Sequence, residues 1–193
     1  MIITEDIFYT PAEPTAIALG TFDGVHIGHR AVISAAVELA ASAREREGEG
    51  LLSAVFTFAD LPRNAFLPEE RRIPALCSPL RRAELIAELG VDIMVCPKFA
   101  SPLKDMSAED FINDILICSL RARHIVCGYD HRFGAGGMGD AELLMHICRR
   151  AGVGVTIVPP VTYNGRRVSS TDIRAALSEG DTETARNMLG HEI

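Results

Sequence analysis

The sequence predicts a Rossmann-like α/β fold, in which helices cover both faces of a doubly wound, mostly parallel sheet. Short apolar runs that are typical of buried strands alternate with longer segments of helical apolar spacing almost throughout the 193 residues. Between Thr15 and Leu39 a strand, a glycine-bearing turn and a helix follow one another directly. This order favours parallel pairing, because each helix can carry the chain back to the start of the next strand.

The first half of the chain supplies three of the expected strands. Apolar runs bounded by glycine, proline or polar residues mark the strands, and the 3.6-residue period marks the helices. The expected elements are a leader at 1–14, a strand at 16–19, a helix from about 26 to about 46 that Gly48-Glu49-Gly50 stops, a strand at 51–58, a long loop with one helical turn at 59–78, a helix at 79–90 and a strand at 91–96.

The second half continues the alternation and departs from it near the end. Hydroxyl and carboxylate residues mark the expected helix starts, because their side chains can cap free backbone N–H groups. The expected elements are a helix from the Ser107 cap to about 121, a strand at 124–128, a loop at 129–139, a helix at 140–151, a strand at 153–158, an Asn-Gly hairpin within 161–168, a helix after the hydroxyl cluster 169–171 that Gly180 ends, and a last helix at 181–189.

Composition limits the possible functions. The net charge of -7 argues against a general nucleic-acid binder, because such proteins need a basic face to neutralise phosphates. No signal-type start and no apolar run long enough to span a bilayer is present, so we expect a cytoplasmic protein without a membrane partner. The five cysteines are odd in number and lack C-x-x-C spacing, as expected of core residues in a reduced compartment. Length and composition fit a single domain over 1–193.

The turn after the first expected strand carries the strongest chemical signal. His26 and His29 are three residues apart, so they project from one face of the first helical turn, beside free backbone N–H groups. Those groups and the helix dipole favour a phosphate, and Gly20, Gly24 and Gly28 allow a ligand to approach the backbone. The alternatives are a capped helix end and a simple tight turn. A zinc site is disfavoured, because no third ligand recurs at suitable spacing.

The string Gly20-Thr21-Phe22-Asp23-Gly24-Val25-His26-Ile27-Gly28-His29 resembles the G-x-F-D-G-V-H-x-G-H signature of the FMN adenylyltransferase domain of bacterial riboflavin kinase/FAD synthetases. The H-x-G-H core is shared by a wider superfamily, so the resemblance implies a fold of the HxGH nucleotidylyltransferase type. It also implies an ATP site. The residues that the resemblance assigns to ATP in this string are Gly20, Thr21, Phe22, Asp23, Gly24, His26, Gly28 and His29.

A second cluster lies near the end of the chain, in Ser169-Ser170-Thr171-Asp172-Ile173-Arg174. Hydroxyls at a helix start lie one turn from an arginine, whose guanidinium can bind phosphate oxygens in a bidentate manner. On spacing alone, an ordinary helix cap with a surface arginine is favoured. The string resembles the S-S-T-x-I-R motif of the same family, and this implies that Ser170, Thr171 and Arg174 grip the ATP phosphates.

Two weaker matches concern the flavin side. Residues 128–134 resemble the family's G-x-D-F-x-F-G, which implies that Asp130 contacts FMN, and residues 57–63 resemble T-F-x-P-x-P-R, which implies a flavin lip with Phe58 and Pro62. His131 stands where the family usually has Phe, and we expect it to be a polar replacement on a solvent-facing loop. Asp60 replaces the first proline of the lip. The glycines at 134–139 predict a mobile flap, a phosphate-proximal loop or a plain flexible loop.

The resemblance implies an FMN adenylyltransferase that transfers AMP from ATP to FMN and releases FAD and pyrophosphate. His26, His29 and Arg174 are the expected catalytic residues, Mg²⁺ is expected to come with ATP, and no metal site formed by the protein is expected. The sequence contains no riboflavin kinase domain, so FMN is expected from a separate riboflavin kinase. The oligomeric state is left open. The alternatives are a nucleotidylyltransferase for another phosphorylated acceptor and an inactive flavin- or ATP-binding module.

Overall fold

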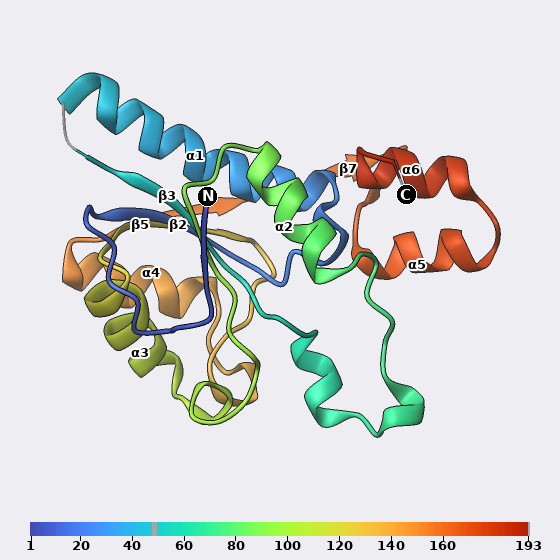
Figure 1. Cartoon of the computed structure of the whole chain (residues 1–193), viewed down its shortest axis with the longest axis horizontal. Helices are drawn as coiled ribbons and strands as arrows, with labels where there is room; N and C mark the ends of the chain where they lie inside the picture. The colour runs from blue at the N-terminus through green and yellow to red at the C-terminus, as the bar shows by residue number, and fades with distance from the viewer. Residues whose placement is uncertain (48–49, 193) are drawn as a thin grey trace.

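The computed structural model describes residues 1–47 and 50–192 and is built around a six-stranded sheet (Figure 1). The strands are β1 Ile2–Thr4, β2 Thr15–Leu19, β3 Leu52–Phe56, β4 Ile93–Val95, β5 Ala122–Gly128 and β6 Gly154–Val158. Their order is β1-β4-β3-β2-β5-β6, and every pairing is parallel. The predicted parallel sheet is confirmed, with β2 near its centre.

The predicted helices are also confirmed, with small shifts at their ends. They are α1 Ile27–Glu47, α2 Pro79–Glu88, α3 Ala108–Asp110 with the π-helical segment η5 Phe111–Ser119, α4 Ala141–Ala151, α5 Ser170–Ser178 and α6 Thr182–Leu189. The oxygens of Ser107, Asp140 and Ser169 accept hydrogen bonds from backbone N–H groups at the starts of α3, α4 and α5, as capping residues do. The expected stop of the first helix includes Gly48 and Glu49, which lie outside the described residues.

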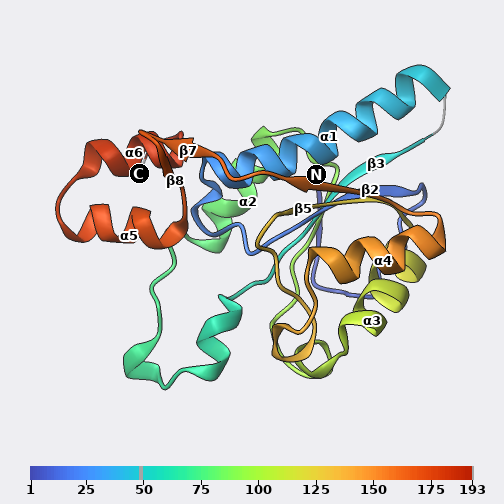
Figure 2. The same cartoon turned by 180° about the vertical axis from the view of Figure 1, so that it is seen from behind.

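The sheet is covered on both faces (Figure 1 and Figure 2). Ile17 and Leu19 of β2 pack with α3, η5 and α4 in one core, while Ala18 between them packs with α1 and α2 in the other. Alternate residues of a strand point to opposite faces, so a strand buried on both sides must be apolar throughout. This is why the strand segments read as continuous apolar runs.

One prediction for the first half of the chain is wrong, and one helix is less regular than predicted. The leader at 1–14 contains β1, which pairs with β4 at the edge of the sheet. Three residues are too few for a periodic signal, and the partner strand lies about ninety residues further on. The helix predicted from 107 to 121 is regular only at α3, and from Phe111 to Ser119 it is π-helical.

The end of the chain forms a separate small unit beside the sheet. The hairpin β7 Thr162–Tyr163 and β8 Arg166–Arg167 turns at Asn164 and Gly165, which both have positive φ, as the predicted Asn-Gly turn requires. The helices α5 and α6 share their own apolar cluster, which also packs against Ile27 of α1. The hairpin therefore leads the chain from β6 to two helices that lie next to the start of α1 (Figure 2).

The loop at 59–78 contains the short turns η2 Pro62–Phe66 and η3 Glu69–Arg71, where one helical turn is predicted. The side chain of Asn64 exchanges two hydrogen bonds with the backbone of Ile73, at 2.8 and 2.9 Å. This pair of bonds closes the loop on itself. No helix in the described ranges is both long and apolar enough to cross a bilayer.

The glycine-containing loop after β5 packs closely on its neighbours. Phe133 and Gly139 exchange two backbone hydrogen bonds across the turn η6 Ala135–Gly137, and the N–H of Ala135 donates to the carbonyl of Met106 at 2.8 Å. A Cβ atom on Gly134 would lie 2.6 Å from the nitrogen of Ala108. The glycine at 134 thus permits a close approach of two backbones.

We expect Gly134→Ala to destabilise the fold more than Gly152→Ala. Gly134 has φ +72° and ψ 174°, a conformation almost confined to glycine, whereas Gly152 has the left-handed conformation at φ +70° and ψ 23°, and a Cβ there meets nothing within 4 Å. Gly152→Ala should therefore show only the cost of a left-handed alanine, about 1 kcal/mol, and Gly134→Ala about 1–3 kcal/mol more from overpacking and from its less accessible backbone conformation. Urea denaturation followed by far-UV circular dichroism measures both, and equal losses would contradict the close approach at Ala108.

Candidate active site

A cavity of about 870 Å³ opens where β2, β3, β5 and β6 end. Its wall includes Gly20, Phe58, Asp130 and Val158, one residue from the carboxyl end of each strand or from the loop that follows it. Parallel strands end on the same side of a sheet, and ligands of such folds bind there. The volume lies within the range of pockets that hold small organic ligands.

The turn after β2 shapes one part of this wall. Phe22 and Gly24 have positive φ, +48° and +78°, and the Phe22 ring is buried. The hydroxyl of Thr57 and the guanidinium of Arg82 both donate to the carbonyl of Thr21, at 2.8 and 3.5 Å. These hydrogen bonds connect the end of β2 to the end of β3 and to α2. Because the turn is held in this way, the direction in which the chain enters α1 is fixed.

The two histidines of the turn stack on each other in the cavity wall. Their ring centroids lie 3.5 Å apart at an interplanar angle of 16°. The backbone N–H of His29 donates to Nδ1 of His26 at 3.2 Å. Because Nδ1 of His26 accepts this bond, the proton of a neutral His26 ring must be on Nε2, which is then a donor.

Both imidazoles are neutral at physiological pH. Burial lowers the pKa of His26 to about 4, against a weaker opposing effect of Asp130. Burial and the neighbouring His26 hold the pKa of His29 well below its usual range. Two imidazolium charges 3.5 Å apart would repel each other by about 5 kcal/mol at an effective dielectric constant of about 20. The pair therefore offers hydrogen-bond donors and no permanent charge.

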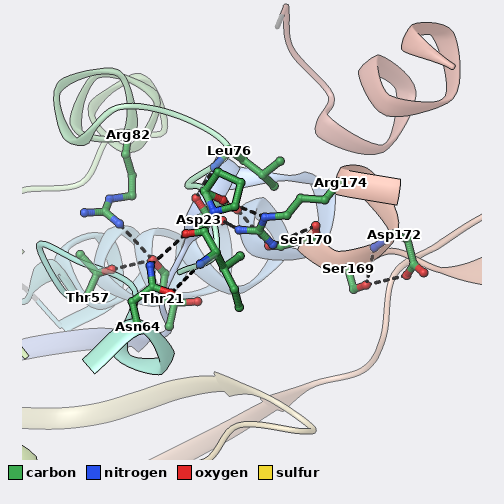
Figure 3. A network of polar contacts seen from close by, with 12 residues as sticks. Thr21, Asp23, Thr57, Asn64, Leu76, Arg82, Ser169, Ser170, Asp172 and Arg174 are labelled. Atoms are coloured by element: carbon green, nitrogen blue, oxygen red, sulfur yellow. Dashed lines mark hydrogen bonds and ion pairs between the residues drawn. The ribbon is translucent and has the colours of Figure 1, made fainter. Parts of the chain in front are cut away.

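Asp23 lies behind the turn and connects three distant segments (Figure 3). Its carboxylate pairs with the guanidinium of Arg174 and accepts the N–H of Leu76 at 2.8 Å, and its side chain is only 3% exposed. Its carbonyl accepts the hydroxyl of Ser170 at 3.1 Å. Arg174 also donates to the carbonyls of Pro74 and Ser170. The start of α5 and the end of the 59–78 loop are thus fixed to the turn.

The structure brings most of the expected site residues into one wall. Those that line the cavity are Gly20, Thr21, Phe22, His26, Gly28, His29, Ser170, Phe58, Pro62 and Asp130. Those outside the lining are Asp23, Gly24, Thr171 and Arg174. The clusters from the two ends of the chain do meet, but Arg174 faces Asp23 rather than the cavity.

Aromatic side chains form another part of the wall. Phe58 lies edge-on to Phe56 and Phe99, with ring centroids 5.7 and 5.1 Å away, and Phe111 lies between Phe56 and Phe133 at 5.2 and 6.0 Å. Neither Phe99 nor Phe111 belongs to one of the sequence motifs, so neither was among the expected site residues. An apolar wall of this kind suits a planar ring system.

The two departures from the family pattern differ in their placement. Asp60 is exposed and is not part of the cavity wall. His131 is half-buried in the wall and stacks on Phe133, with ring centroids 5.8 Å apart. The loop faces solvent at Asp130 and Arg132, as expected, while the His131 ring itself is half-buried. The carboxylate of Asp130 is exposed and pairs with Arg167 at 3.1 Å, so the β7–β8 hairpin is held at the rim.

Arg82 is a further residue that sequence reasoning missed. Its side chain is buried, and its Nη2 donates to the carbonyls of Phe58 and Ala59 at 2.7 and 3.1 Å. In the parts of the chain that the structure covers, it has no carboxylate partner. Arg82 therefore places a positive charge behind the wall and fixes the loop after β3.

The described residues contain no group of three His, Cys, Asp or Glu side chains placed to hold a metal ion. Asp130 in the cavity wall and Asp23 behind the turn are both paired with arginines.

Comparisons with known proteins agree with this geometry. The model of the FAD synthetase family matches residues 9–172. A bifunctional riboflavin kinase/FMN adenylyltransferase of Listeria monocytogenes is 37% identical over 177 residues, which cover 91% of this chain and 53% of the relative. An FAD synthetase of the same species is 33% identical over 175 residues, covering 91% of this chain and 68% of the relative.

A crystal structure named as a macrolide-efflux protein from Streptococcus pneumoniae is similar over 98% of this chain and 60% of its own, with a TM-score of 0.82 and 28% identity. The chain spans about half the length of the bifunctional relative that it matches. The family model covers most of the chain, including both histidines and Ser170. The chain therefore belongs to the FAD synthetase family of nucleotidyltransferases.

Proposed function

We propose that this chain is an FMN adenylyltransferase, which transfers AMP from ATP to the phosphate of FMN and releases FAD and pyrophosphate. The observation that carries the proposal is that one cavity joins a neutral histidine pair at a helix start to an aromatic wall. A nucleotide with a planar ring and a phosphate fits such a space. The names of the Listeria relatives, FMN adenylyltransferase and FAD synthetase, support the same reaction.

The proposed reaction needs no general base. The phosphate of FMN is already ionised at neutral pH, and one of its oxygens attacks the α-phosphorus of ATP in line. A new phosphorus–oxygen bond forms as the bond to the β-phosphate oxygen breaks, and pyrophosphate leaves with that electron pair. Catalysis then consists of holding the reactants in line and stabilising charge on the phosphoryl oxygens.

His26 and His29 are the proposed donors to those oxygens, together with free N–H groups at the start of α1. Gly28 assists by leaving room, because a Cβ there would lie 3.2 Å from the His26 ring. The hydroxyl of Ser170 lies in the same wall. Arg174 acts in this proposal by holding the turn through Asp23, since its guanidinium is outside the cavity lining.

Magnesium belongs to the proposal as part of the MgATP substrate, bound by phosphate oxygens and water. The acceptor must already carry a phosphate, so a riboflavin kinase reaction has to supply it.

We place the reaction in the cytoplasm, where ATP is present and where cysteines such as Cys96 and Cys127, free in this structure, stay reduced. A nucleotidylyltransferase for another phosphorylated acceptor is the second candidate, because His131 adds a polar group to the aromatic wall.

The test is chromatographic detection of FAD from the purified chain with FMN, ATP and magnesium. Riboflavin in place of FMN is the control for the acceptor phosphate and should give no FAD. Other phosphate monoesters, each assayed for pyrophosphate release, test the second candidate. Binding of FMN without FAD formation would contradict the proposed activity and leave a binding module.

We expect His29→Ala to lower kcat by about 10²- to 10³-fold, the loss seen when one preorganised donor to a developing oxyanion is removed. The backbone N–H that donates to His26 remains in this variant, so the neighbouring ring keeps its position. His146→Ala, at an exposed position of α4 outside the cavity, is the matched control and should retain full activity. Near-normal turnover of His29→Ala would remove this residue from the mechanism.

We expect Asp23 and Arg174 to be coupled in stability. Asp23→Asn and Arg174→Gln should each lower the free energy of unfolding, and the double variant should lose about 1–3 kcal/mol less than the sum, because each single change leaves a partner unpaired. The exposed pair Arg81–Glu84 on α2 is the control and should couple by less than about 1 kcal/mol. Additive losses at Asp23 and Arg174 would contradict their proposed joint role.

A further inference from the structure

His131 is a polar side chain next to the aromatic part of the cavity wall, between the exposed residues Asp130 and Arg132, which line the same cavity. Its ring lies nearly parallel to that of Phe133, at an interplanar angle of 18°, and Phe111 lies on the other side of Phe133. Its ring nitrogens form no hydrogen bond with any residue in the described ranges. Neither nitrogen is among the buried polar atoms that lack a partner, so both are open to the cavity, where a bound ligand can form a hydrogen bond with them.

The backbone holds His131 in place on both sides. Its own N–H donates to the carbonyl of Gly128 at 3.1 Å, at the end of β5. Two residues further on, Phe133 and Gly139 exchange hydrogen bonds at 3.2 and 2.9 Å. The imidazole is therefore presented to the cavity from a fixed position, as a residue that recognises a ligand must be.

The His131 ring is neutral at neutral pH although charged residues flank it. Burial lowers the pKa of His131 to about 4, although the negative charge of Asp130 acts in the opposite direction. Asp130 itself is paired with Arg167, and the neighbouring Arg132 is paired with Asp140. At neutral pH the ring therefore carries one donor and one acceptor nitrogen and can match a carbonyl, an imide N–H or a ring nitrogen.

We propose that His131 determines acceptor specificity by forming a hydrogen bond to the polar edge of the planar heteroaromatic ring that the acceptor inserts into the aromatic wall. This inference rests on the proposed function, because it concerns the acceptor of the same reaction. An aromatic wall alone would bind any flat apolar ring. A single directed hydrogen bond selects rings with a polar edge, since a ring without one leaves the imidazole unpaired.

The experiment compares wild type, His131→Phe and His131→Asn. The dissociation constants of FMN and of riboflavin, which has the same ring without the phosphate, are measured from the fluorescence of the flavin. We expect His131→Phe to weaken both flavins by the same factor, about tenfold. His131→Asn keeps polar atoms and should bind better than His131→Phe. In FAD synthesis, KM for FMN should rise about tenfold, with kcat and KM for ATP within about twofold of wild type.

His146→Phe, the same chemical change at an exposed position of α4, is the matched control and should alter none of these constants. Unchanged flavin affinity in both His131 variants would overturn the inference. A loss confined to FMN would also overturn it, because the contact would then be to the phosphate. If wild type binds both flavins but makes no FAD, the proposed function fails, while the binding comparison still decides the role of His131.

Discussion

The buried ion pair between Asp23 and Arg174 is the contact on which the candidate site depends. It joins residues 151 positions apart and sets the start of α5 against the turn that carries the histidines. Removing a carboxylate as buried as Asp23 from water is unfavourable unless a cation and hydrogen bonds replace the water. Arg174 and the N–H of Leu76 supply both. The turn, the 59–78 loop and the C-terminal helices therefore take their positions together.

The same pair explains how an acidic chain can present a wall suited to anions. The net charge is -7, yet the carboxylate of Asp23 is turned away from the cavity and neutralised, and Asp130 is paired at the rim. The cavity lining contains the neutral imidazoles, the Ser170 hydroxyl and three arginines, Arg63, Arg132 and Arg167, of which the last two are paired with Asp140 and Asp130. These side chains are hydrogen-bond donors, and such donors stabilise phosphate oxygens. The local field, not the overall charge, decides what binds here.

The sequence was sufficient to predict the parallel sheet, the helices on both faces and a set of site residues most of which line the cavity, because these follow from apolar periodicity and from a few short motifs. It could not predict contacts that depend on distant partners. Asp23 belongs to the motif and was assigned to ATP, but its pairing with Arg174 exists only in three dimensions. Arg81 and Arg82 are adjacent and chemically identical in sequence, and only the phase of α2 makes one an exposed partner of Glu84 and the other a buried anchor.

The two parts of the cavity wall also constrain the orientation of any nucleotide acceptor. The binding free energy of a planar ring is most favourable against the aromatic part, where Phe58 and Phe99 offer apolar edges. The binding free energy of its phosphate is most favourable near the donors of the histidine pair. The reverse placement would bury the polar face of the turn under an apolar ring. Arg82 strengthens this preference, because its buried guanidinium lies behind Thr21 and Phe58, where the two parts of the wall meet. In the proposed reaction, this orientation would bring the acceptor phosphate to His26 and His29.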